Sequence, residues 1–348
     1  MNTAELSLVH ANHPIGSGAF SRVESFSSEE DAMALLAALP GMSGHTLALL
    51  SANNEVAEAA EALGRGALGP LARIPGAGGA AAKNGWKALA KSAQPREVIS
   101  AFGRAGASML SSRHRFYPDR LRHLLLPPVL AVRGNAASLI GLPTVAVVGT
   151  ADCTAYGGDV ARSVARELAC EGVAVLSAEG RGIQAAASRG ASEAARAPSV
   201  LVRTHLDLPQ LGQGQRAELA GVAPGRRAGR VPLVRQSPVE LSASPAGSGA
   251  ELWERRAKEE LIANLAEVVV VVECFMNDRV MALAELAAER GATVMAVPGS
   301  IRSPASRGPN ALLSAGCHPC TATEDVVAAL SLAGAGNGAS WEHLGLAT

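Results

Sequence analysis

The chain has 348 residues, of which 48% are apolar, 18% are charged and only 3% are aromatic. This length supports one large domain with a smaller one and excludes a disulfide-stapled miniprotein, while the composition excludes an intrinsically disordered chain. Lys and Arg together number 31, as do Asp and Glu, so any affinity for nucleic acid must come from local basic clusters and not from net charge.

The N-terminal segment shows little periodicity, and we predict an irregular extension over residues 1–30. It lacks a basic stretch followed by an apolar one, which would indicate a secretory signal, and the odd number of five cysteines is typical of reduced thiols. The most apolar run, residues 268–272, is far shorter than the roughly 18 residues that a membrane-spanning helix needs. We therefore expect a soluble, cytoplasmic protein that does not contact a membrane.

A small helical module is predicted over residues 31–110. The pattern becomes helical over residues 29–63, with Pro40 and Gly41 as the break between a first helix and a second one that continues to residue 63. The Gly- and Ala-rich stretch 64–82 is typical of a flexible connection or a poorly ordered insertion.

From Thr144 the chain alternates between β-branched runs and helical segments, which predicts a parallel sheet covered on both faces. The expected fold class is α/β, with a doubly wound Rossmann-like domain over residues 111–330 and a tail over residues 331–348. Ligands of such sheets bind outside the carboxyl ends of the strands. The predicted strands are residues 144–148, 173–177, 200–203, 268–272 and 293–297, and the predicted helices start near Gly158 and Ile183 or span 251–265 and 280–290.

Six sequence blocks stand in a fixed order over roughly 60% of the chain. They are RFYP at 115–118 with PPVLAVRGN at 127–135, VAVVGTADCTAYG at 145–157, LSAEGRGIQAAASRGA at 176–191, LAEVVVVVEC at 265–274, MAVPGSIRSPASRGPNALLSAG at 295–316, and TEDVV at 323–327. Together they resemble the DprA/Smf family of DNA-processing proteins, and the helices near residues 35–63 are similar to that family's N-terminal domain. The resemblance implies a non-catalytic homodimer that binds single-stranded DNA and assists a RecA-type recombinase in recombination or natural transformation.

Small residues after two of the predicted strands would let backbone N–H groups approach a phosphate, and the helix dipoles that follow would add attraction. A serine hydroxyl and two arginines nearby could add hydrogen bonds, those of the arginines being worth about 1.5 to 3 kcal/mol each. The alternative is that the glycines merely make tight strand-to-helix turns. With two further arginines, the predicted DNA- and phosphate-binding residues are Gly149, Thr150, Gly157, Ser177, Gly180, Arg181, Gly182, Arg189, Arg120 and Arg122; no cofactor and no metal are expected.

Two Arg-rich segments could follow a phosphate backbone. Between Arg104 and Arg133 the only acidic residue is Asp119, and Arg120 and Arg122 belong to this first segment. The second segment carries five arginines. Arginine on an ordinary solvated surface is the alternative for both, and it is as good an interpretation as DNA binding for the second segment, which contains Arg216, Arg226, Arg227, Arg230 and Arg235.

Several positions depart from the family pattern that the resemblance implies. An Arg is expected in the first loop, where this chain has Ala151 followed by Asp152, and an Arg-Arg-Asn-Arg segment is expected before the long apolar strand. Because each lost phosphate contact lowers affinity, these changes predict weaker DNA binding. A Rossmann-like nucleotide sensor, or a degenerate paralogue with weak or no DNA binding, is therefore the alternative function. The residues at the expected basic segment are Ala257, Lys258, Glu259 and Glu260.

The loop after the long apolar strand also differs from the pattern. Phe275 and Met276 stand where a Gly- and Ser-rich loop is expected, and we predict that they fill the pocket, with base stacking by Phe275 as the alternative. The sequence lacks the Pro-Gly-Gly-x-Gly-Thr loop of related phosphoribohydrolases, which argues against an enzyme. Glu273 and Glu285 are the carboxylates near that strand end, and we expect Glu273 to face water.

Two cysteines lie close together near the C-terminal end, in the sequence CHPC at residues 317–320. One cysteine pair cannot complete a tetrahedral zinc site, and a thioredoxin-type role requires the pair at a helix start in another topology. We interpret Cys317 and Cys320 as two thiols in a turn. The remaining cysteines are scattered over other predicted elements, at Cys153, Cys170 and Cys274.

Overall fold

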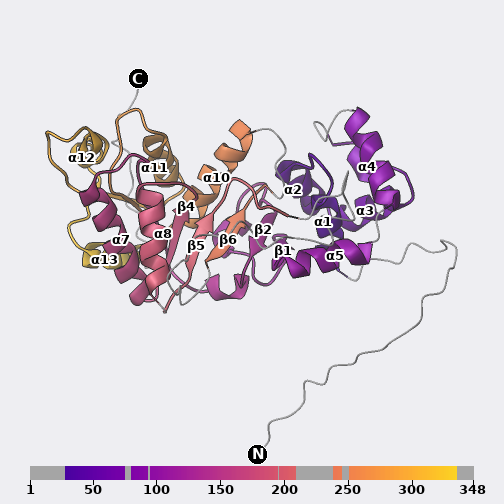
Figure 1. The fold of residues 1–348 in the computed structure, drawn as a ribbon, viewed down its shortest axis with the longest axis horizontal. Coiled ribbons are helices and arrows are strands. Elements are labelled where there is room, and N and C mark those ends of the chain that lie inside the picture. The colour runs from indigo at the N-terminus through magenta and orange to yellow at the C-terminus, as the bar shows by residue number, and fades with distance from the viewer. Residues whose placement is uncertain are drawn as a thin grey trace, which may run out of the picture.

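The computed structural model describes residues 28–74, 80–92, 95–194, 196–208, 238–244 and 251–334. These residues form a nine-stranded sheet with helices on both faces and a helical module beside one end of the sheet (Figure 1). The predicted α/β fold class, with a mostly parallel sheet and an N-terminal helical region, is confirmed.

The five predicted strands form the centre of the sheet. All of them pair in parallel, and each boundary agrees with the prediction to within one residue. Their runs of β-branched residues suit a position buried on both faces. They are β3 (Thr144–Val148), β4 (Ala174–Ala178), β5 (Ser199–Val202), β7 (Val268–Val271) and β8 (Thr293–Ala296).

Four further strands extend the sheet to the order β1-β2-β6-β5-β4-β3-β7-β8-β9. β2 runs antiparallel to both β1 and β6, whereas β6 pairs in parallel with β5, and β9 pairs in parallel with β8. The sequence pattern did not identify these four strands, each of which has at most one β-branched residue. They are β1 (Ala107–Leu110), β2 (Leu130–Arg133), β6 (Val239–Ser242) and β9 (His318–Pro319).

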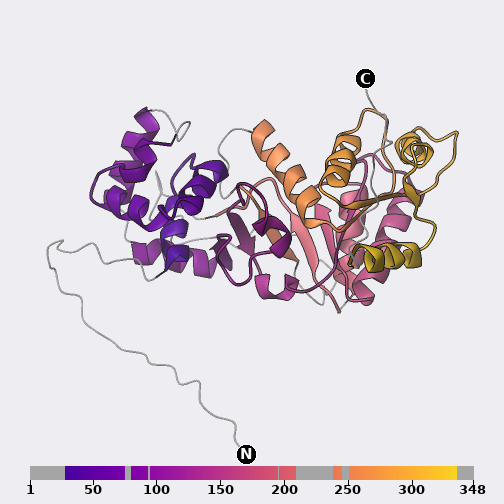
Figure 2. The same ribbon diagram turned by 180° about the vertical axis from the view of Figure 1, so that it is seen from behind.

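The two faces of the sheet carry separate cores. Val145 and Val147 of β3 point into one cluster, while Ala146 and Val148 point into the other, as strand alternation requires. α7 and α8 cover the face of the sheet that is turned toward the viewer in Figure 1. α10 and α11 cover the opposite face, which Figure 2 shows. The helices around the sheet are α6 (Asp119–Arg122), α7 (Ala155–Cys170), α8 (Ile183–Glu193), α10 (Glu251–Leu265), α11 (Arg279–Glu289), α12 (Arg307–Ser314) and α13 (Thr323–Gly334), with short turns η2 (Ala136–Leu139) and η3 (Pro304–Ser306).

The helical module shares its core with the near end of the sheet, because Met109 of β1 and Ala131 of β2 pack among its helices. The predicted single helix up to residue 63 is wrong: it breaks after Ala52, where Asn54 adopts a left-handed backbone with φ of 60°. The elements of the module are α1 (Glu29–Ala37), α2 (Gly44–Ala52), α3 (Val56–Gly64), η1 (Gly69–Ala72), α4 (Ala80–Ser92) and α5 (Pro95–Arg104).

The prediction of a flexible connection over residues 64–82 is wrong for its described parts. Leu71 and Ile74 are buried in the core of the module, and α4 begins at Ala80. Burying these hydrophobic side chains removes apolar area from water, and this gain exceeds the flexibility that the Gly- and Ala-rich composition favours. Within the described part of the chain, no helix is both long and apolar enough to cross a membrane.

Candidate nucleic-acid interface

The turn between β3 and α7 is held by bonds to two neighbouring elements. The Thr150 N–H donates to the Glu273 carbonyl at 2.6 Å, and the Thr150 carbonyl accepts from the Ile183 N–H at 3.2 Å. A Cβ on Gly149 would lie 2.6 Å from Ile183 Cγ1 and 2.7 Å from the Glu273 carbonyl oxygen, so a side chain does not fit there. Gly149 and Thr150 therefore contact both the end of β7 and the start of α8, at the carboxyl edge of the sheet.

Glu273 does not face water as predicted, because it is only 2% exposed. Its Oε2 accepts from the Thr154 N–H at 2.8 Å and its Oε1 accepts from the Thr154 hydroxyl at 2.7 Å. A Cβ on Gly157 would overlap this carboxylate. Gly157, predicted to make room for a phosphate, instead makes room for the protein's own carboxylate.

The turn between β4 and α8 packs against the turn after β3. Gly180 and Gly182 have φ values of 149° and 66°, which favour glycine, and a Cβ on Gly182 would overlap the carbonyl oxygens of Thr150 and Ala151. Ser177 is 1% exposed, and its buried hydroxyl has no hydrogen-bond partner within the described structure. The structure thus brings together the two glycine turns that the sequence singled out.

Of two further predicted arginines, Arg181 lies within the β4–α8 turn and Arg189 lies midway along α8. The Arg181 guanidinium, 76% exposed, lies 2.8 Å from Asp152 Oδ1, in the loop after β3. Such an exposed pair is worth at most about 1 kcal/mol, so a phosphate can compete with Asp152 for Arg181. Arg189 is exposed on α8, and no ion pair involves it in the part of the chain that the structure describes.

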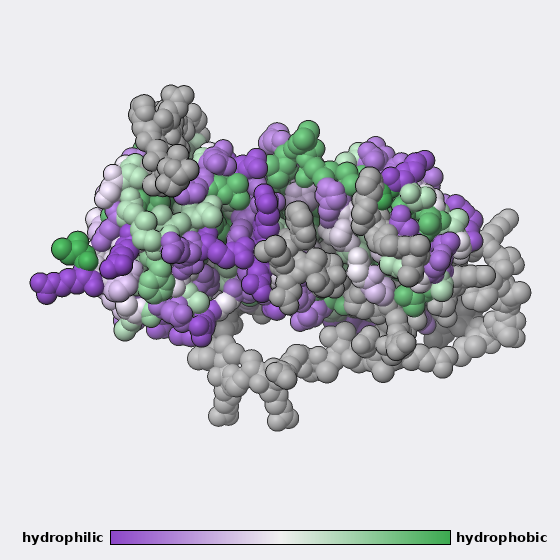
Figure 3. All heavy atoms as spheres, turned by 90° about the horizontal axis from the view of Figure 1, so that it is seen from above, coloured by the Kyte–Doolittle hydropathy of each residue, from purple (hydrophilic) through white to green (hydrophobic). Residues whose placement is uncertain are grey.

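Residues of both charges on α10, at the expected basic segment, form ion pairs with neighbouring elements. Lys258 Nζ lies 3.8 Å from Glu179 Oε1, and Arg279 lies 2.9 Å from Glu259. Burial raises the pKa of Glu179, but hydrogen bonds from Thr204 and the nearby cations outweigh it and leave that pKa lowered. These pairings leave little uncompensated positive charge at this part of α10. In the view from above, the hydrophilic residues lie in several separate groups (Figure 3).

Arg120 and Arg122 are not brought to the glycine turns. Arg120 Nε donates to the Asn264 carbonyl at 3.2 Å, in the last turn of α10, so it lies near the amino end of β7. Arg122 donates to the backbone carbonyls of Ser112, His114 and Tyr117 and pairs with Asp119. Arg122 therefore holds its own loop together. The second Arg-rich segment, residues 216–235, lies outside the described residues.

The loop after β7 does not fill the site. Phe275 and Met276 are 40% and 48% exposed, so the prediction that they occupy the pocket is wrong. The Cys274 N–H donates to the Ala305 carbonyl and the Gly308 N–H donates to the Cys274 carbonyl, which ties this loop to η3 and α12 and leaves Phe275 and Met276 outside.

Cys317 and Cys320 do not converge on a common point. Cys317 packs in the cluster with α10 and α11, whereas Cys320 packs in the cluster with α7 and α8, on the opposite face of the sheet. Burial raises the pKa of each thiol to about 11. Among the described residues, no group of three or more His, Cys, Asp or Glu side chains is arranged to hold a metal.

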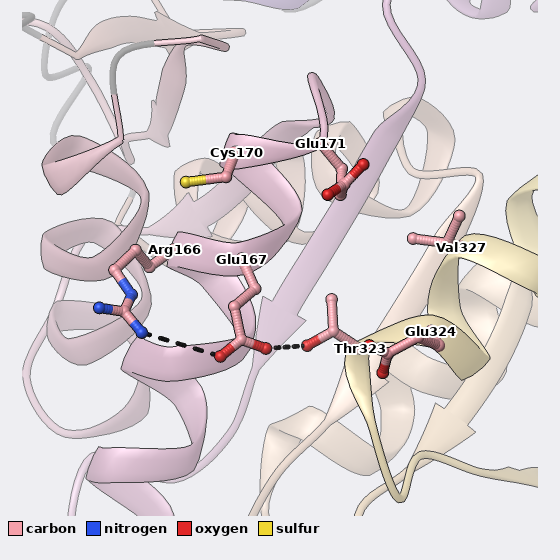
Figure 4. Close-up of a pocket in the computed structure, with 7 residues that line it drawn as sticks. All are labelled: Arg166, Glu167, Cys170, Glu171, Thr323, Glu324 and Val327. Carbon is pink, nitrogen blue, oxygen red and sulfur yellow. Dashed lines mark hydrogen bonds and ion pairs between the residues drawn. The ribbon is translucent and has the colours of Figure 1, made fainter.

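A cavity of about 570 Å³ lies between α7 and α13, away from the glycine turns (Figure 4). Thr323 donates to Glu167 across it at 2.5 Å, and this hydrogen bond is the main cause of the lowered pKa of Glu167. Glu171 and Glu324 add two further carboxylates, against one guanidinium from Arg166. This surplus of negative charge disfavours a phosphate backbone, so we do not assign the DNA site to this cavity.

The sequence is similar to a known protein family and to characterised members of it. A family model described as DNA recombination-mediator protein A matches residues 108–331. DNA processing protein DprA of Bacillus subtilis (strain 168) is 26% identical over 234 residues, which cover 66% of this chain and 73% of that protein. Protein Smf of Escherichia coli (strain K12) is 27% identical over 221 residues, and the chain spans 55% of its length.

Two solved structures are similar to this fold. DNA processing protein A from Streptococcus pneumoniae has a TM-score of 0.61 and 23% identity, over 88% of this chain and 98% of that one. DNA processing protein A from Helicobacter pylori, described for its unique single-stranded DNA binding mode, has a TM-score of 0.51 and 21% identity, over 65% and 95% of the two chains.

Proposed function

The chain belongs to the DNA recombination-mediator protein A family, also called DprA/Smf. We propose that it binds single-stranded DNA and assists the loading of a RecA-type recombinase. The observation that supports this role best is the meeting of the turns at Gly149-Thr150 and Gly180-Arg181-Gly182, beside the buried hydroxyl of Ser177. Ligands of doubly wound sheets bind at this edge.

In the proposed complex, backbone N–H groups of the β4–α8 turn contact a phosphate oxygen. Arg181 exchanges Asp152 for a phosphate, and Arg189 on α8 contacts the same strand. Arg120 and Arg122 lie outside this site, because one bonds the end of α10 and the other holds its own loop. The binding is non-catalytic in this proposal, since holding the strand requires no bond to be made or broken.

Weak binding is part of the proposal. Arg181 is paired with Asp152 and Lys258 with Glu179, so phosphate must displace internal carboxylates before it gains those cations. The same pairing favours the alternative function, a paralogue that keeps the fold but senses a nucleotide or binds DNA hardly at all. We further propose a cytoplasmic homodimer with the domain division at about residue 110, acting in recombination or natural transformation.

The proposed function is tested with a fluorescently labelled oligo-dT in anisotropy titrations at low salt. We expect wild type to prefer single-stranded over duplex DNA, and Arg181→Glu to bind at least about tenfold more weakly because it reverses a charge at the phosphate. Arg166→Glu is the matched control, since Arg166 lies on α7 at the acidic cavity. An equal loss of DNA affinity in both variants would argue against this site. The proposed recombinase partner is tested separately, by measuring whether the protein stimulates the ATPase activity of RecA on single-stranded DNA coated with a single-strand-binding protein.

A further inference from the structure

Two cavities lie along one side of α7, and they differ in the charge of their walls. Tyr156, Val160 and Val164 line one of them. Glu167 and Glu171 line the other, which is the acidic cavity between α7 and α13 (Figure 4). Because these positions follow one another at intervals of three or four residues, they share one side of the helix. Tyr156 is in the first turn of α7, so the first cavity lies at the carboxyl edge of the sheet.

The cavity beside Tyr156 has a volume of about 280 Å³, and none of the described residues that line it carries a charge. This volume is just below the range of cavities that hold drug-sized ligands, so it suits a single flat group the size of a nucleobase. The wall opposite α7 comes from the end of β8 and from the segment between β9 and α13. It consists of Val297, Pro298, Cys320, Thr321 and Ala322.

Tyr156 gives the cavity an aromatic wall. This residue is 53% exposed, and its hydroxyl forms no hydrogen bond with the residues that the structure describes. Val160 and Val164 continue the apolar surface from the ring along α7. An exposed ring next to an apolar surface is the arrangement on which the bases of single-stranded nucleic acids stack.

The polar groups at the rim of the cavity are already bonded within the protein. Asp325 Oδ2 accepts from the hydroxyl and the N–H of Thr321 and from the N–H of Ala322. These donors face a carboxylate, and its negative charge repels a phosphate. The cavity therefore favours a neutral, flat group over the charged backbone of a strand.

The cavity lies close to the proposed phosphate contact. Asp152, the partner of Arg181, precedes Tyr156 by four residues in the loop after β3. Four residues span at most roughly 14 Å. A strand of a few nucleotides can therefore place a phosphate at Arg181 and a base at Tyr156.

We propose that this cavity holds one nucleobase of the bound single strand, stacked on the ring of Tyr156, while Arg181 contacts the phosphate backbone. The inference rests on the proposed function and deepens it, because it adds a base position to the phosphate contact. It also gives a physical reason for a preference for single strands, since a base in a duplex must first be unpaired and unstacked before it can enter the cavity.

The test compares wild type, Tyr156→Ala and a matched control, Tyr156→Phe, which keeps the ring. Anisotropy titrations measure the affinity of each for oligo-dT and for an oligonucleotide of the same length that has no bases. We expect Tyr156→Ala to bind oligo-dT about tenfold more weakly than wild type, within the range for one base stacked on an aromatic side chain. Tyr156→Ala should bind the abasic strand as wild type does, and Tyr156→Phe should match wild type on both.

The outcomes separate this inference from the proposed function. If wild type and Tyr156→Ala bind oligo-dT equally well, the function stands and the base position is wrong. The base position is also wrong if Tyr156→Ala loses the same factor on both oligonucleotides, or if it binds DNA normally but stimulates RecA less, which would assign the cavity to a protein partner. If wild type binds neither oligonucleotide, the proposed function fails and the base position fails with it.

Photo-cross-linking locates the base directly and serves if Tyr156→Ala fails to fold. An oligonucleotide with iododeoxyuridine in place of thymidine is bound to wild type and irradiated, and peptide mass spectrometry identifies the attached residue. We expect attachment at Tyr156. Attachment at Phe275, the exposed aromatic side chain after β7, or elsewhere without attachment at Tyr156 overturns the inference.

Discussion

Thr154 and Glu273 are joined by two hydrogen bonds, from the Thr154 N–H to Oε2 at 2.8 Å and from its hydroxyl to Oε1 at 2.7 Å. They connect the start of α7 to the end of β7. Thr154→Val removes the hydroxyl, which both donates to Glu273 and caps α7, so we expect the free energy of unfolding to fall by about 1–2 kcal/mol. Urea denaturation measures this, with Thr154→Ser as the control that keeps the hydroxyl. A stable Thr154→Val would contradict the bridge.

Adjacent glycines in α7 provide a second test of the buried carboxylate. A Cβ on Gly157 would overlap Glu273, whereas one on Gly158 would meet only Cys153 Sγ at 3.8 Å. We expect Gly157→Ala to destabilise the protein by more than about 2 kcal/mol. Gly158→Ala should be neutral or stabilising by up to about 1 kcal/mol, because alanine is the better helix former. Thermal unfolding measures the stability of both variants. Equal melting temperatures for Gly157→Ala and Gly158→Ala would contradict the contact between Gly157 and Glu273.

The central sheet could be predicted from the sequence because its strands are short apolar runs that contain valine and alternate with helical segments. The break at Asn54 was missed, although the polar residues Asn53 and Asn54 interrupt the apolar pattern and Asn is common where a helix ends. The burial of Glu273 was also missed, because the sequence does not show which way the residue after a strand points. A buried Val run directly followed by a carboxylate is the signal that could have suggested it.

Ionic partners distant in sequence were equally hidden. The pairing of Lys258 with Glu179 depends on how α10 packs over the loop after β4, and Arg181 meets Asp152 only because two turns pack together. The sequence located the glycine turns correctly and assigned Arg120 and Arg122 to a separate DNA-contacting segment, but clustering along the chain does not show that Arg122 bonds its own loop or that Arg120 bonds the end of α10.

The cysteines should differ sharply in reactivity. Cys170 is exposed, whereas burial raises the pKa of Cys274 to about 12 and those of Cys317 and Cys320 to about 11. Because the thiolate is the reactive form, we expect a thiol reagent to label Cys170 in the native protein and the three buried thiols only after denaturation. Peptide mass spectrometry would identify the labelled sites. Rapid native labelling of Cys317 and Cys320 would disprove their separate burial.

The start of α13 should respond to acid. Asp325 Oδ2 accepts from the Thr321 hydroxyl and from the N–H groups of Thr321 and Ala322, which lower its pKa. A lowered folded pKa gives stability that is present above the ordinary carboxyl range of about pH 4 and is lost as the pH falls further. Asp325→Asn should therefore lower the melting temperature at pH 7, and the deficit should shrink as the pH falls below 4, so that it is smaller at pH 3 than at pH 7. An equal deficit at both values would refute this explanation.

Arg122 should matter for folding and not for DNA. Its guanidinium bonds three backbone carbonyls, so Arg122→Gln should cost about 2–3 kcal/mol of unfolding free energy. Arg120→Gln loses a single bond to Asn264 and should cost less than about 1 kcal/mol. Urea unfolding measures both. A stable Arg122→Gln that had lost affinity for DNA would place the DNA on this segment.

The most direct test of the central proposal is the affinity of wild-type protein for a labelled oligo-dT, measured by fluorescence anisotropy across a series of salt concentrations. We expect a micromolar dissociation constant at low salt and a slope of log affinity against log salt of about −1.4, because two arginines, Arg181 and Arg189, contact phosphate. No binding even at the lowest salt would contradict a single-stranded-DNA role for this chain.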